Sequence, residues 1–203
     1  YHRYGEDIAL AASLGYNTHR FSIEWARVEP EPGQYSLAAI GYYRRVLEAI
    51  RKHGMTPVVV YNHFTVPRWF ASAGGFTSPA GVEPFVRYCR FVTEQLGDLF
   101  DIAITQNEPN LWAQLAWSPT YPRLRAAFDA ANKAAAKAEG SDIFASPTLS
   151  DWKVQQPVMI EAHNRAREAI RQASGGRIEV GFTLSLPDDR APPLGNNIRG
   201  RLR

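Results

Sequence analysis

The sequence predicts an α/β protein built around a parallel sheet. Four times along the 203 residues, an amphipathic helical pattern is followed by a glycine and then by a short apolar segment. These apolar segments are rich in Val, Ile, Phe and Thr, as buried strands are. Helices that alternate with such strands are typical of β/α units.

Each predicted helix carries a stripe of apolar residues and ends at a glycine. The helices end before Gly15, Gly54, Gly97 and the pair Gly175-Gly176, where we expect the left-handed conformation that glycine adopts at helix ends. The stripes comprise residues 8–14; Tyr43, Val46, Leu47 and Ile50; Phe85, Cys89, Val92 and Leu96; and Met159, Ala162, Ala166 and Ile170.

The four predicted strands cover residues 18–23, 57–61, 102–105 and 178–184. Such a sheet is either open and doubly wound or closed into a barrel. No glycine-rich phosphate loop follows a strand, and two long connections, 64–81 and 110–156, follow the carboxyl ends of strands. Both observations favour a (β/α)8 barrel. The alanine-rich segment 126–138 is expected to be an inserted, exposed helix.

Composition excludes several classes of protein. The 23 basic and 20 acidic residues give a net charge of +3, too small to indicate nucleic-acid binding. No segment reaches the ~20 consecutive apolar residues of a membrane span. With Cys89 as its one cysteine, the chain forms no internal disulfide and no zinc site made of several thiolates.

Polar residues at the carboxyl ends of barrel strands are the candidates for catalysis. Here they are Arg20 on the first strand, His63 after the second, and Asn107 and Glu108 after the third. Each also has a structural interpretation. His63 could be a hydrogen-bonded structural residue, Glu108 a helix cap or a salt-bridge partner, and Arg20 the counter-ion of a nearby carboxylate.

Five segments resemble the motifs of one enzyme family. Residues 20–28 read RFSIEWARV and are followed by Pro30; residues 63–67 read HFTVP and are followed by GGF at 74–76; residues 105–109 read TQNEP; residues 2–8 read HRYGEDI; and residues 161–164 read EAHN. In order and spacing they resemble glycoside hydrolase family 1, the β-glucosidase family, over most of residues 1–184.

The resemblance implies a retaining β-glycosidase whose partner is a small carbohydrate, with no metal or other cofactor. Glu108 would be the general acid/base. Asn107 would hydrogen-bond the sugar 2-hydroxyl, His63 would bind a hydroxyl further round the ring, and Arg20 would lie under the nucleophile and keep it ionised. Trp25, Trp69, Trp112 and Trp117 would either stack on sugar rings or pin the loops of this face.

One expected element of that family is missing from the sequence. The family's nucleophile is a second glutamate in a [TV]-E-N-G motif, and no such motif occurs here. Glu24 and the pair Asp188-Asp189 are the available substitutes, and neither has motif support. Phe64 replaces the tryptophan that more often follows the family's histidine, which leaves the substrate preference open.

We therefore expect a partial (β/α)8 TIM barrel over residues 1–187, approximately strands two to five with their helices, and a basic, irregular tail over 188–203. A truncated or frame-shifted chain of this kind would be inactive alone, and it would be poorly stable or self-associate through its exposed barrel edges. The alternatives are a non-catalytic remnant, a weak sugar-binding module, or another glycosidase of the same clan. The sequence assigns no compartment.

Overall fold

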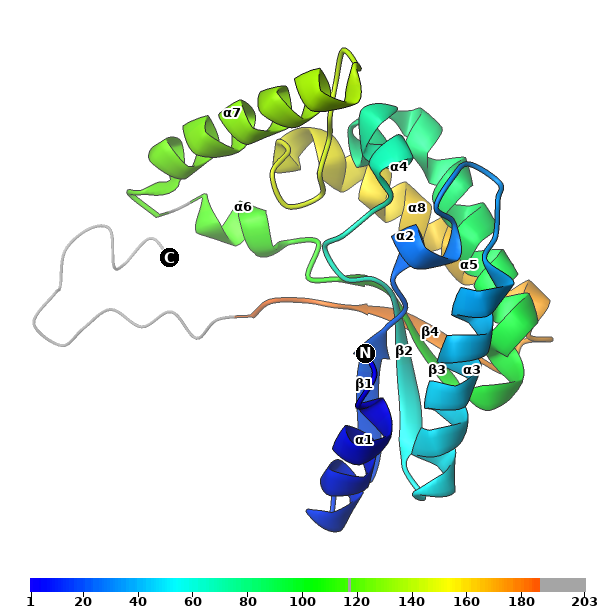
Figure 1. Cartoon of the computed structure of the whole chain (residues 1–203). Coiled ribbons are helices and arrows are strands. Elements are labelled where there is room, and N and C mark those ends of the chain that lie inside the picture. The colour runs from blue at the N-terminus through cyan, green and yellow to red at the C-terminus, as the bar shows by residue number, and fades with distance from the viewer. Residues whose placement is uncertain (117, 187–203) are drawn as a thin grey trace, which may run out of the picture.

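A four-stranded, all-parallel sheet forms the centre of the molecule (Figure 1). The computed structural model describes residues 1–116 and 118–186. Its strands lie in the order of the sequence: β1 (Thr18–Ser22), β2 (Thr56–Asn62), β3 (Ile102–Asn107) and β4 (Glu179–Thr183). Parallel strands need crossover connections. Each connection here contains at least one helix.

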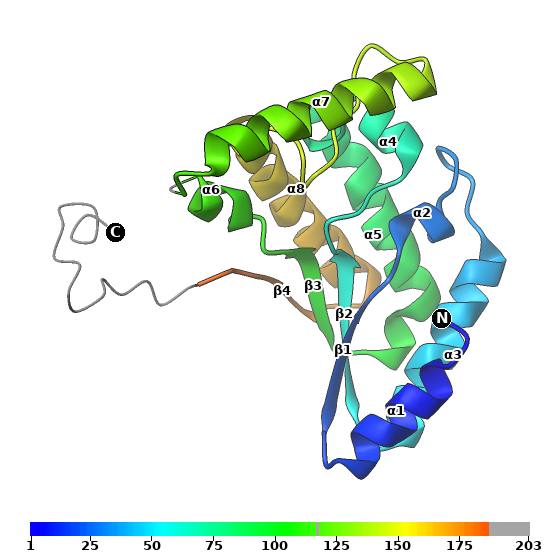
Figure 2. The same ribbon diagram turned by 60° about the vertical axis from the view of Figure 1, so that its left-hand side comes forward.

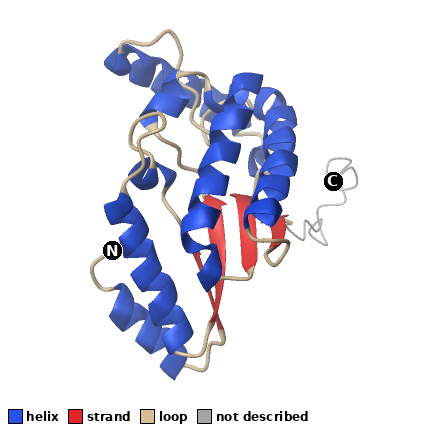
Figure 3. Cartoon of the chain, turned by 90° about the vertical axis from the view of Figure 1, so that its right-hand side faces the viewer, coloured by secondary structure: helices blue, strands red, loops and turns tan. Residues whose placement is uncertain are grey.

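Helices α1, α3, α5 and α8 form a layer on one face of the sheet, seen from the side in Figure 2 and in front of the strands in Figure 3. Helices α5 and α8 pack against each other, α3 lies against β2, and α1 lies against α3. Their bounds are α1, Tyr4–Ser13; α3, Leu37–Lys52; α5, Val82–Leu96; and α8, Trp152–Ala173.

Shorter helices and one long insertion lie at the carboxyl ends of the strands (Figure 1). These are α2, Trp25–Val28; α4, Arg68–Ser72; α6, Leu111–Leu115; and α7, Tyr121–Glu139. Three short 3-10 helices flank α5: η1, Gly75–Thr77; η2, Pro79–Gly81; and η3, Gly97–Leu99. Helix α7 covers the alanine-rich segment, and Ala136 is its one buried residue, so the expected exposed helix is confirmed.

The two faces of the sheet differ because side chains alternate along each strand. Phe21, Val59, Ala103 and Val180 belong to the apolar core under the helices. On the opposite face the strand register aligns another row of residues: Arg20, Val58, Ile102 and Glu179. A sheet with helices on one face only, in sequential strand order, is the arrangement found in a (β/α)8 barrel. The predicted fold class is confirmed.

One expectation about the helix ends is wrong. Gly15, Gly54 and Gly175 have φ of 86°, 74° and 63°, as expected for left-handed residues. Gly97 has φ of −63°, an ordinary right-handed value. A β-carbon there would lie 3.1 Å from Thr93 Cγ2 and 3.5 Å from a side-chain atom of Ile178. This glycine therefore lies in close contact with Thr93, a tertiary feature that periodicity does not reveal.

Within the described residues, β1 and β4 each pair with a strand on one side only. None of the described helices is long and apolar enough to cross a membrane. The described part of the chain also contains no group of three or more His, Cys, Asp or Glu side chains that could hold a metal ion. The predicted basic tail, 188–203, and Trp117 lie outside the described residues.

Candidate active site

Side chains from three strands meet at the carboxyl end of the sheet. Arg20 Nη2 donates a hydrogen bond to Asn107 Oδ1 and lies 3.5 Å from Thr183 Oγ1. The Thr183 hydroxyl donates to the same Asn107 oxygen at 3.1 Å. Asn107 is 6% exposed. Because its amide oxygen is held by two donors, its amide N–H2 group is oriented away from Arg20 and is available to a ligand.

The backbone at Glu108 is strained. Glu108 has φ of 46°, a left-handed value that costs a residue with a β-carbon ~1–3 kcal/mol. Two hydrogen bonds hold it there: its N–H donates to the Thr183 carbonyl at 3.0 Å, and its own carbonyl accepts from Leu111 at 3.0 Å. Phe64, with φ of 69°, is the other non-glycine residue of the described chain with positive φ, and it directly follows His63.

The charges of the site act on His63. Burial lowers the pKa of the His63 imidazole, the positive charge of Arg20 lowers it further, and the Glu108 carboxylate acts in the opposite direction. The imidazole is therefore neutral near pH 7, with one ring nitrogen that donates and one that accepts. Such a ring can either donate a hydrogen bond to a hydroxyl group or accept one from it.

The structure thus brings together the four residues selected from the sequence. It adds Thr183, which the sequence analysis missed because the residue belongs to no motif. Thr183 is the last residue of β4, so its position at the carboxyl end of a strand was the available signal. Thr183 binds Asn107 through its side chain and Glu108 through its backbone carbonyl.

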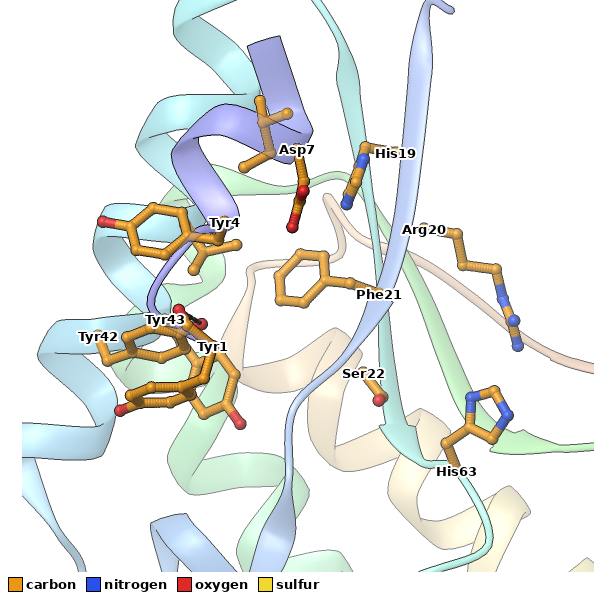
Figure 4. Close-up of a pocket in the computed structure, with 12 residues that line it drawn as sticks. Tyr1, Tyr4, Asp7, His19, Arg20, Phe21, Ser22, Tyr42, Tyr43 and His63 are labelled. Atoms are coloured by element: carbon orange, nitrogen blue, oxygen red, sulfur yellow. Dashed lines mark hydrogen bonds between the residues drawn. The ribbon is translucent and has the colours of Figure 1, made fainter. Parts of the chain in front are cut away.

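Two hollows adjoin these residues. The larger, about 530 Å³, lies between α1, α3 and β1 and is lined by Tyr1, Tyr4, Tyr42 and Tyr43 among others, with Arg20 and His63 also on its wall (Figure 4). Asn107 and Glu108 line a second, smaller pocket together with Asn62, Phe64, Trp112 and Gln155. The candidate residues therefore lie between a wide hollow at the sheet edge and a narrow pocket under α6 and α8.

Glu24 has a structural role. Its carboxylate caps α2 by accepting from Ala26 N at 3.4 Å, and it accepts from Thr65 Oγ1 at 2.8 Å. These bonds tie the loop after β1 to the loop after β2. Asp188 and Asp189, the other proposed substitutes, lie outside the described residues.

Two of the described tryptophans pin loops, and a third lines the pocket of the site. Trp25 is 1% exposed, stacks on Tyr88 and donates to Glu29 Oε2 at 2.8 Å. Trp69 donates to the Glu29 carbonyl at 3.0 Å and packs edge-on against Trp25. Both indoles pin the loops, one of the two alternatives that the sequence left open. Trp112 packs edge-on against Phe128 and lines the pocket beside Glu108.

Comparison with known proteins identifies the family. Residues 1–194 match the sequence model of the family described as glycosyl hydrolase family 1. The chain belongs to glycosyl hydrolase family 1. The resemblance stated from the motifs is thereby confirmed, and with it the general class, a glycoside hydrolase.

Individual members of glycosyl hydrolase family 1 are similar over nearly the whole chain. The coniferin β-glucosidase of Pinus contorta is 35% identical over 190 residues, which are 92% of this chain and 36% of that protein. The apo structure of β-glucosidase 1317 superposes with a TM-score of 0.92 at 56% identity, covering 95% of this chain and 48% of that one. The β-glycosidase BGL167 gives a TM-score of 0.81 at 41% identity, with 91% and 45% covered. The chain thus spans about half of these two solved structures and about a third of the pine enzyme.

Proposed function

We propose that this chain is the part of a retaining β-glycosidase that carries the general acid/base, and that the complete enzyme hydrolyses β-glucosides or related sugars. The observation that supports this most is the meeting of Asn107 and Glu108 with Arg20 and His63 in a chain of glycosyl hydrolase family 1. The backbone strain at Glu108 and Phe64 is a second support, because strained residues concentrate at functional sites.

In the proposed mechanism, Glu108 first donates its proton to the glycosidic oxygen as the bond to the leaving group breaks. It then accepts a proton from the water that releases the sugar. The Asn107 amide N–H2 group hydrogen-bonds the sugar 2-hydroxyl. This contact becomes stronger as positive charge develops on the ring in the transition state. Neutral His63 binds another hydroxyl of the same ring.

The nucleophile completes this mechanism and lies, in our proposal, outside the chain. A retaining glycosidase needs a second carboxylate ~5–5.5 Å from the first. Glu24, the carboxylate considered as a substitute, is engaged by Ala26 and Thr65. Arg20 would stabilise the negative charge of the nucleophile. We therefore propose that the chain alone does not turn over glycosides.

A chimera tests the function. In β-glucosidase 1317, the segment that matches this chain is replaced by this chain, and hydrolysis of cellobiose, which has a poor leaving group, is measured. We expect the chimera to hydrolyse the substrate and Glu108→Gln to lower kcat/KM ~100-fold or more, the usual size of a general acid/base contribution. Glu24→Gln is the matched control and should change kcat/KM little, because the glutamine oxygen can accept from Ala26 N–H while its N–H2 group donates to the Thr65 hydroxyl oxygen.

A folded but inactive chimera would favour the alternative that the chain is a non-catalytic, weakly sugar-binding module. An active chimera in which Glu108→Gln has no effect would remove Glu108 from the mechanism. Circular dichroism of each variant separates these results from a failure to fold.

A further inference from the structure

The small pocket beside Glu108 contains buried polar groups that have no partner. It lies where α6, which begins shortly after Glu108, faces the first turn of α8. Gln155 of α8 is 3% exposed, and neither its amide oxygen nor its amide nitrogen has a hydrogen-bond partner among the described residues. The indole nitrogen of Trp112 on α6 is buried and equally without a partner there.

Three such atoms in one pocket need an explanation. More than nine-tenths of buried polar groups in proteins are hydrogen-bonded to protein or to ordered water. A buried amide that loses its water contacts without replacement destabilises the fold. By contrast, Gln106 of β3, 1% exposed, donates to the Met159 carbonyl at 3.0 Å. This other buried glutamine, which packs against α8, thus finds a partner within the protein.

The size and chemistry of the pocket specify what fills it. Its volume is about 20 Å³, and a single water needs roughly 10–15 Å³. A water oxygen can accept from the Trp112 indole N–H and from the Gln155 amide, while one of its hydrogens is donated to the Gln155 amide oxygen.

We propose that Gln155 and Trp112 hold one resident water between α8 and α6, and that this water bridge fixes α6 against the barrel. Helix α6 is joined to Glu108, because the Glu108 carbonyl accepts from the N–H of Leu111, the first residue of α6.

Nuclear magnetic resonance of the ¹⁵N-labelled full chain tests the water directly. The Trp112 indole signal is assigned from Trp112→Phe, and transfer of magnetisation from water is recorded. We expect a cross-peak of the sign given by a water that stays bound for longer than the tumbling time of the protein. The indoles of Trp25 and Trp69, which donate to Glu29, are internal controls and should show none. A Trp112 indole without this cross-peak overturns the proposal.

Gln155→Met provides an independent test, because methionine fills nearly the same space without polar atoms. Loss of the bridge should raise the equilibrium constant of unfolding in urea about tenfold. Gln156→Met is the matched control: Gln156 lines the same pocket and has no unpartnered buried atom, so it should change the constant less than about twofold. An unchanged or lowered constant for Gln155→Met means that the pocket is dry and overturns the proposal.

Discussion

The ionisation of His63 depends on two residues that come from other strands. Arg20 lies on β1 and Glu108 follows β3, and both charges act on the His63 ring at the end of β2. The folded-state pKa of His63 lies below its unfolded value. As the pH falls below ~6.5, the unfolded chain therefore binds the proton first, and His63 contributes to a loss of stability.

Substitution of the two charged residues should shift the pKa of His63 in opposite directions. Arg20→Gln removes a positive charge and should raise the pKa, whereas Glu108→Gln removes a negative charge and should lower it. The imidazole signals in an NMR titration of the chain give both values. The pKa of His163, which is lowered by burial and by Arg167, should stay constant in both variants. Shifts of the same sign in both variants would contradict the proposed cluster.

At the scale of elements, close contacts between backbones fix the segment that precedes α5. A β-carbon at Gly81 would lie 2.1 Å from the Gly75 carbonyl oxygen, and one at Gly75 would lie 2.7 Å from the Ala145 carbonyl oxygen. The atoms in contact belong to backbones, which cannot move aside as a flexible side chain can. The loop after β2, the start of α5 and the segment before α8 are thereby joined.

Gly81→Ala should lower the free energy of unfolding by about 3 kcal/mol. Gly41→Ala, inside α3, is the control: its β-carbon would meet only the end of Arg45, at 3.6 Å, and alanine in a helix is favoured over glycine by up to ~1 kcal/mol. Urea denaturation followed by circular dichroism measures both. Equal stabilities of the two variants would show that the contact at Gly81 does not restrict the fold.

Most elements could be predicted from the sequence, because their signals are local. The stripe Met159, Ala162, Ala166 and Ile170 is buried on α8 as its spacing requires, and the four strands follow their glycines. The contact of Arg20 with Asn107 depends on the register of three strands, and the left-handed backbone at Glu108 depends on Thr183. These features are set by tertiary structure, so the sequence indicated the site residues without their geometry.

At the scale of the whole molecule, apolar side chains are exposed at the open side of β4. Ile160, Phe182, Leu184 and Leu186 are 57%, 45%, 46% and 79% exposed. They adjoin a strand whose outer edge has no neighbour within the described residues. Unpaired parallel edges with apolar surroundings favour association with other chains.

We expect the isolated chain to self-associate through this surface. Light scattering should give a mass above that of a monomer. The double substitution Phe182→Lys with Leu184→Lys should lower that mass, because it places charges beside the open edge. Leu124→Lys on the exposed helix α7, where Leu124 is 39% exposed, is the control and should not. A monomer mass at every concentration tested, without any substitution, would contradict this expectation.

The central claim is that Glu108 donates the proton to the leaving group. The most direct test measures kcat/KM of the chimera with aryl β-glucosides whose phenol leaving groups span a wide range of acidity. For Glu108→Gln we predict a loss of ~100-fold or more with the least acidic phenols and a much smaller loss with the most acidic, which need no proton. A loss that is equal across the series, or one that also follows from Glu24→Gln, would contradict the account.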